Sequence, residues 1–182
     1  MPGRRPPEAV AKFLAPLQLA ASCITKAVFE VGGGYHPADT PHVLILNRGE
    51  PVRLRGAGGE LALSVLMQYR IVRADAERGP WKVRTMAYAY TLFEAGRESL
   101  AYHWHPERRE EGQWVTFPHL HVSAGGAVGR RLEKAHLPTG RVALEDVVRL
   151  ALTDLKVTAL RPDWERVLRA TQAAYEKWRT WS

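Results

Sequence analysis

The chain of 182 residues contains a single cysteine, Cys23, and this scarcity removes several classes of protein. One thiol forms no internal disulfide and cannot build a cysteine-ligated zinc cage. No apolar run approaches the roughly 20 residues that a membrane-spanning helix needs. The N-terminal segment lacks the uninterrupted apolar region and cleavage site of a secretory signal. We therefore expect a cytoplasmic protein with no membrane association.

Familiar nucleotide-binding and nucleophile motifs are also missing. The run Gly32–Gly34 is not followed by the lysine and helix of a phosphate-binding loop, so we interpret it as a flexible turn. Ser123 lies in no recognisable nucleophile motif, and Cys23 is distant in sequence from the other candidate residues. The sequence therefore predicts neither a phosphate-binding loop nor a serine or cysteine nucleophile.

Acidic residues are in deficit, with 19 Asp and Glu against 26 Lys and Arg, which gives a formal net charge of +7. Such a charge favours a polyanionic partner, either RNA or another nucleic acid, or an acidic protein. The content of 46% hydrophobic and 25% charged residues is typical of a globular protein. The length predicts one domain spanning residues 1–182.

Alternating polar and apolar residues predict a mainly antiparallel sheet, built on a meander between residues 63 and 123. Shorter strands at Ser22–Val31, His42–Leu46 and Pro51–Leu54 precede it. The four strands predicted for the meander are Leu63–Arg73, Lys82–Phe93, Glu98–Arg109 and Gln113–Ser123.

Helices are predicted at both ends of the chain. In segment 143–180, Ala143–Leu155 and Pro162–Trp178 each carry an apolar stripe of helical period, so we expect a helix pair packed on one face of the sheet. At the N-terminus, residues 1–7 are expected to form a flexible or partner-held tail. A short helix over Glu8–Leu14 should end at Pro16. The predicted fold class is α+β.

Four histidines occupy two His-apolar-His triplets, His103–His105 and His119–His121, which flank a predicted hairpin. Side chains at i and i+2 share one face of a strand, so each triplet presents two imidazoles to the same side. A hairpin tip centred on Gly112 places His105 opposite His119 and His103 opposite His121, which joins all four on what we call the histidine face. The opposite, apolar face then contains Leu100, Tyr102, Trp104, Trp114, Leu120 and Val122.

Neighbouring strands should add other polar groups to the histidine face. A turn at Ala95-Gly96 pairs Tyr88 with His103. By the same alternation, the two preceding strands of the meander contribute Arg84, Tyr88, Tyr90, Gln68 and Arg70.

Three interpretations of the four histidines remain open. His103, His105, His119 and His121 could together bind zinc or another divalent transition metal, with Glu107 as the acid positioned to orient a ring. Acid–base catalysis without a cofactor is the second interpretation. The third is structural, with imidazoles that bond across the strands or face solvent or a partner chain. His36, His42 and His136 are isolated in the sequence, and for them we expect a structural role.

The acid–base interpretation fits cleavage of RNA by its own 2′-hydroxyl. One imidazole removes the proton and another donates one, while a nearby cation stabilises charge that develops on the phosphate. Arg84 and Arg70 could supply that cation, and Tyr88 could orient the phosphate or act as an acid. Arg109 is a further candidate for contact with nucleic acid.

A resemblance adds to this interpretation. The segments Tyr88–Thr91, Leu100–Pro106 and Thr116–Val122 resemble the TumE-like proteins of bacterial and archaeal toxin–antitoxin pairs, which have a Tyr-rich strand and a "TFPHHxH"-type segment. Here Leu120 stands where that family's run has its middle histidine. The likeness covers about a third of the chain and implies a toxin whose physical partner is a small antitoxin protein.

The leading hypothesis is a toxin-like, metal-independent ribonuclease. His103, His105, His119 and His121 would be its acid–base candidates, and Arg84 and Tyr88 would contact phosphate. One alternative is a non-catalytic subunit that binds nucleic acid or joins a larger complex. The other is an enzyme that depends on a histidine-ligated metal.

Overall fold

The computed structural model describes residues 1–56, 60–73, 79–106, 109–110, 113–123 and 135–178, with backbone only at 109–110, 113–114 and 178. Its main feature is an eight-stranded sheet in the order β1-β2-β4-β5-β6-β9-β10, with β3 beside β4 and every pair antiparallel. The strands of this sheet are β1 (Phe29–Gly32), β2 (His42–Leu46), β3 (Val52–Leu54), β4 (Leu61–Arg73), β5 (Trp81–Glu94), β6 (Arg97–Trp104), β9 (His119–Val122) and β10 (Leu137–Pro138).

Two further strands, β7 (Arg109–Glu110) and β8 (Gln113–Trp114), pair with each other. The helices within the described residues are α1 (Pro6–Ala21), α3 (Leu144–Thr153) and α4 (Trp164–Trp178), with a 3₁₀ turn, η1 (Asn47–Gly49). The α+β class, the antiparallel sheet and the two C-terminal helices are as predicted. None of the described helices is long and apolar enough to cross a membrane.

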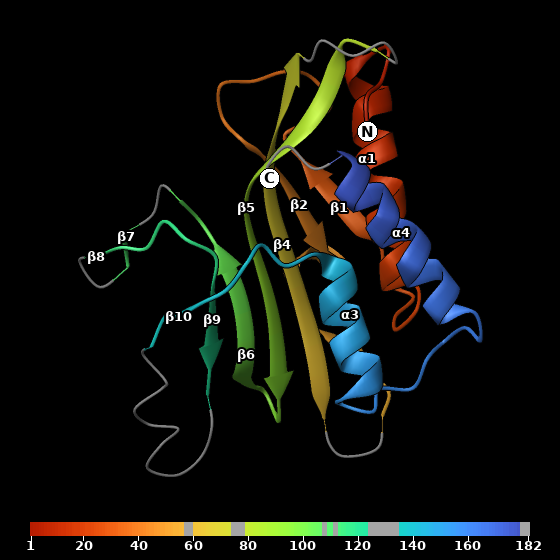
Figure 1. Cartoon of the computed structure of the whole chain (residues 1–182), viewed down its shortest axis with the longest axis vertical. Coiled ribbons are helices and arrows are strands. Elements are labelled where there is room, and N and C mark those ends of the chain that lie inside the picture. Colours follow the sequence, from red (N-terminus) through yellow and green to blue (C-terminus); the bar gives the residue numbers. More distant parts are fainter. Residues whose placement is uncertain (57–59, 74–78, 107–108, 111–112, 124–134, 179–182) are drawn as a thin grey trace.

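The helices gather on one side of the sheet, and β6, β9 and β10 form the end of the sheet that lies away from them (Figure 1). Alternation explains this layering, because every second residue of β4, from Leu63 to Ile71, is buried in the core. We call this side the helix face. The opposite side of β4 carries the exposed Leu66 and Gln68, so no layer from the described residues covers it there.

The apolar stripes predicted for the two C-terminal helices both enter the core. Their buried members are Leu144, Val147, Val148, Ala151, Leu152, Val167 and Leu168.

Helix α1 is longer than predicted, because it continues through Pro16 to Ala21. A proline inside a helix costs about 3 kcal/mol through the lost hydrogen bond and its ring clash. The turn beyond Pro16 buries Leu17, Ala20 and Ala21, and burial of a leucine side chain alone contributes about 2 kcal/mol. The prediction that Pro16 ends the helix is therefore wrong, because tertiary burial offsets the local cost.

The start of the chain pairs with the sheet at Gly3, where we expected a flexible or partner-held tail. The Gly3 N–H donates to the Trp81 carbonyl at 2.8 Å, and the Trp81 N–H donates back at 3.2 Å. Pro6 and Pro7 begin α1, where the first turn tolerates a residue without an N–H.

The strand predicted over Ser22–Val31 begins only at Phe29 in the structure. The N–H groups of residues 22–24 instead donate to carbonyls of the last turn of α1.

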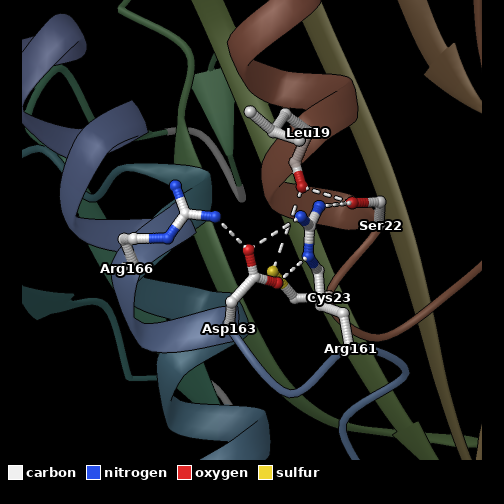
Figure 2. Close-up of polar contacts among 6 residues, drawn as sticks. All are labelled: Leu19, Ser22, Cys23, Arg161, Asp163 and Arg166. Atoms are coloured by element: carbon white, nitrogen blue, oxygen red, sulfur yellow. Dashed lines mark hydrogen bonds and ion pairs between the residues drawn. The ribbon is translucent and has the colours of Figure 1, made fainter.

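A polar cluster joins the end of α1 to the start of α4 (Figure 2). The Arg161 guanidinium donates to both Asp163 carboxylate oxygens, at 2.6 and 3.1 Å, and to the Ser22 hydroxyl at 3.2 Å. Arg166 also donates to Asp163. The hydrogen bond from Arg161 holds the pKa of the Asp163 carboxyl below its ordinary value.

We expect Asp163→Asn to lower the thermal unfolding midpoint at pH 7. A carboxyl with a lowered folded pKa stabilises the fold above its ordinary pKa and loses that contribution as pH falls through the folded pKa. The difference between variant and parent should therefore shrink toward acidic pH. Asp39→Asn, the same change of charge in an exposed loop, is the control for thermal scans across pH. A difference that grows toward acidic pH would contradict the role of this cluster.

Glu145 lies in the core, where it is 1% exposed and lines an apolar cavity with Met67, Tyr90 and Leu144. Burial raises the pKa of its carboxyl above the ordinary value. A raised acid pKa stabilises the folded form at low pH, and this contribution is lost as pH rises from the ordinary value through the folded one.

We therefore expect Glu145→Gln to match the parent at acidic pH and to exceed its unfolding midpoint increasingly as pH approaches 7. The exposed Glu165→Gln removes the same charge and should show no such growth. Denaturant or thermal unfolding across pH measures both. If the parent remains more stable than Glu145→Gln at pH 7, other interactions of the buried carboxylate must offset the cost of its desolvation.

Candidate metal centre

The predicted histidines share one face of the sheet, and they do so through the pairing of β6 with β9. His103 lies opposite His119, and Ala101 lies opposite His121. This register differs from the predicted one by two residues, so every side chain keeps its face. The prediction that both His-apolar-His triplets point to one side is therefore confirmed, although the predicted opposite pairs are wrong.

The imidazole rings form a compact group. The ring centroids of His103 and His121 are 5.0 Å apart, and those of His103 and His119 are 5.8 Å apart. His105 follows the end of β6 and lies 5.2 Å from His119 and 5.8 Å from His103. The histidine face thus joins the four rings in one connected group, in which His103 and His119 each lie next to the other three.

A fifth histidine, His136, joins this group through β10. Leu137 pairs with Leu120, which places His136 beside β9 on the histidine face. Its ring lies 5.0 Å from His119 and 4.9 Å from His121. His136 is isolated in the sequence, where we expected a structural role, but the fold places it in the cluster. Sequence periodicity missed it because β10 has only two residues, one of them proline.

The five histidines make two sets of three whose ligand atoms lie within 4.8 Å of one another. We call His103, His105 and His119 the inner triad, and His119, His121 and His136 the outer triad. Tetrahedral zinc with bonds of 2.0–2.1 Å would need nitrogens about 3.4 Å apart. Small rotations of the rings would close that difference, so each triad could hold a transition-metal ion and leave a fourth position open.

His119 is the centre of this arrangement and is 0% exposed. Its Nδ1 lies 3.0 Å from the Phe117 carbonyl oxygen. Because a carbonyl only accepts, the proton must be on Nδ1, and Nε2 carries the lone pair that could bind a metal. A backbone carbonyl that orients a ligating histidine in this way is common in metal sites.

Tyr88 and Tyr90 do not lie on the histidine face, contrary to the prediction. The turn at Ala95-Gly96 is as expected, but Ser99 is an extra residue in β6, because Phe93 pairs with Glu98 while Leu92 pairs with Leu100. Ala89 therefore lies opposite His103, and Tyr88 lies opposite Trp104. Both tyrosines are buried in the core on the helix face.

The environment of Tyr88 also argues against its predicted role. Its hydroxyl accepts a hydrogen bond from the Val142 N–H at 3.0 Å. Burial raises the pKa of the phenol above its ordinary value. The Tyr88 hydroxyl is therefore part of the core, on the side of the sheet away from the imidazoles.

Arg70 and Arg84 do lie on the histidine face, where they are cross-strand partners, and Gln68 lies beside them. A bulge at Met86 keeps Arg84 on the same face as Ala89, the partner of His103, and the interval between them matches four residues of β4, which is about 13 Å along the strand. The acid–base hypothesis supposed that these arginines are adjacent to the imidazoles, and in the structure neither of them is. Glu107 lies outside the described part of the chain, and so does the side chain of Arg109.

A groove of about 320 Å³ lies between these arginines and the histidine cluster. Its lining includes the small residues Ala87 and Ala89 of β5, with Leu66 and Gln68 of β4. His105 borders it, so an ion in the inner triad would stand at one end of the groove. A substrate lying in the groove would reach that ion directly.

No protein-family model, curated protein or solved structure matches this chain. The resemblance to the TumE-like toxins therefore stays a prediction, and the function rests on the geometry of the site.

Proposed function

We propose that the histidine face binds a divalent transition-metal ion and uses it for hydrolysis of a phosphodiester substrate lying in the groove. The observation that carries this proposal is the convergence of imidazole nitrogens within 4.8 Å around the buried His119. Imidazole ligands suit zinc, copper, nickel and iron. We place this activity in the cytoplasm, as the sequence suggests.

The ligand set supports hydrolysis as the reaction. Three neutral imidazoles leave the positive charge of the ion undiminished, and an open fourth position admits water or substrate. Such an ion lowers the pKa of bound water to about 7 and so supplies a nucleophile at neutral pH. Closed structural sites, in contrast, usually have four protein ligands.

A polyanionic substrate is favoured by the arginine pair on the same face. Arg70 and Arg84 are direct cross-strand neighbours, an arrangement that is destabilising for like charges. The buried Arg70 Nε has no hydrogen-bond acceptor among the described residues. A phosphate between the two guanidinium groups would relieve both costs, and the net charge of +7 would attract a nucleic acid.

The second candidate is the metal-independent ribonuclease of a toxin–antitoxin pair, with a small antitoxin as partner. The same arginine pair and the shared face of His103 and His119 favour it. In this candidate Tyr88 has no catalytic role, and Arg84 contacts a phosphate other than the one beside the imidazoles. A non-catalytic protein that binds nucleic acid is the third outcome that experiments must distinguish.

Metal binding is tested first with protein purified without an affinity tag. At a Zn²⁺ concentration 100 times the Kd, binding to the folded state alone stabilises it by about 2.7 kcal/mol, which raises the unfolding midpoint. We expect this rise in the parent and its loss in His119→Gln, which keeps a similar side-chain volume. His36→Ala, a histidine in an exposed loop, should behave like the parent. An unchanged response in His119→Gln would remove the proposed site.

Hydrolysis is tested with matched RNA and DNA single strands, before and after chelation and with Zn²⁺ restored. We expect cleavage of both strands, loss on chelation, recovery with the ion, and no activity in His103→Ala/His119→Ala. Metal-assisted hydrolysis uses water and so needs no 2′-hydroxyl, whereas acid–base cleavage does.

Each other outcome identifies a different function. Cleavage of RNA alone that survives chelation but not the double substitution would support the second candidate. Binding without turnover, with log affinity falling against log salt, would indicate a non-catalytic nucleic-acid-binding protein. A double variant as active as the parent would show that the histidines are not catalytic.

A further inference from the structure

The two triads share one ligand, and that ligand can offer only one nitrogen. His119 belongs to both sets, and its Nδ1–H donates to the Phe117 carbonyl at 3.0 Å. Nε2 is then the single ligating atom of His119, and one lone pair binds one ion. The inner and outer triads therefore cannot be complete at the same time.

A bridging imidazolate would be the other way to fill both triads. It would require removal of the Nδ1 proton, which would take from the Phe117 carbonyl the hydrogen bond that this ring donates. It would also place two divalent ions on opposite nitrogens of one ring, although Nδ1 is aimed at a backbone oxygen. The geometry thus favours a single ion on Nε2.

We infer that the protein holds one ion at a time in two exchangeable positions, and this inference rests on the metal binding proposed above. In the inner position His103 and His105 complete the coordination beside the groove. In the outer position His121 and His136 complete it against β10. The ion moves between them by exchanging two ligands while His119 keeps hold of it.

The distances around His119 make this exchange a short one. Its ring centroid lies 5.2 Å from that of His105 in the inner triad and 5.0 Å from that of His136 in the outer triad. Between the two sets, the rings of His103 and His121 are 5.0 Å apart. The outer position would therefore store the ion away from the groove, against β10, and the inner position would present it to substrate.

The first test is the stoichiometry of the full chain, measured by titration with Co²⁺, whose visible absorption reports the ligand set. One equivalent is expected. Two equivalents at comparable affinity would overturn the inference while supporting metal binding. No binding at all would refute the proposed function, and this inference with it, so the two failures are distinguishable.

The second test separates the shared ligand from the alternative ones. His105→Ala leaves the outer triad intact and His136→Ala leaves the inner triad intact, so each should still bind one Co²⁺ with affinity reduced only about twofold to tenfold. His119→Gln disturbs both triads. Its loss of Co²⁺ affinity should exceed the roughly 100-fold that removal of a hydrogen-bond partner of a metal ligand costs at most. The parent spectrum should be a weighted sum of the His105→Ala and His136→Ala spectra.

Two results in these variants would overturn the inference. The first is that either single alanine variant loses binding as completely as His119→Gln, because only one triad would then be a site. The second is a parent spectrum identical to that of one variant and unrelated to the other. His36→Ala again serves as the matched control outside the cluster.

Discussion

The candidate metal centre depends on the two-residue period of strand pairing. His103 faces His119 across β6 and β9, and the pairing of Leu137 with Leu120 brings His136 beside His121. A slip by one residue in either pair would turn one set of rings to the other side of the sheet. A slip by two residues would not, so the shared face is robust even though the individual partners are not.

The asymmetry of the sheet determines what this face can do. The helices cover β4 and β5 on one side, where Tyr88 and Tyr90 fill the core, and they leave the other side open. On that open side β5 carries Ala87 and Ala89 next to the histidines. The small residues beside the imidazoles leave a groove on this side of the sheet, and His105 borders that groove.

Sequence patterns predicted the parts of this structure that are repeated over many residues. The long strands, the two C-terminal helices and the shared face of the His-apolar-His triplets follow from periodicity sustained along a segment. Features that depend on a single residue or a very short segment could not be predicted from periodicity. The extra residue at Ser99 reverses the parity between β5 and β6, Pro16 is tolerated because its neighbours are buried, and β10 is too short to show alternation.

The five histidines are not equivalent ligands, and burial explains why. His119 is enclosed and held by the Phe117 carbonyl, whereas the other four rings are half-buried. Closing ligand atoms from within 4.8 Å to the roughly 3.4 Å of a tetrahedral site requires movement. That movement must come from the half-buried rings, since a core side chain repacks at greater cost. A buried ligand with half-buried partners on both sides is an arrangement that would allow an ion to change its coordination without leaving the protein.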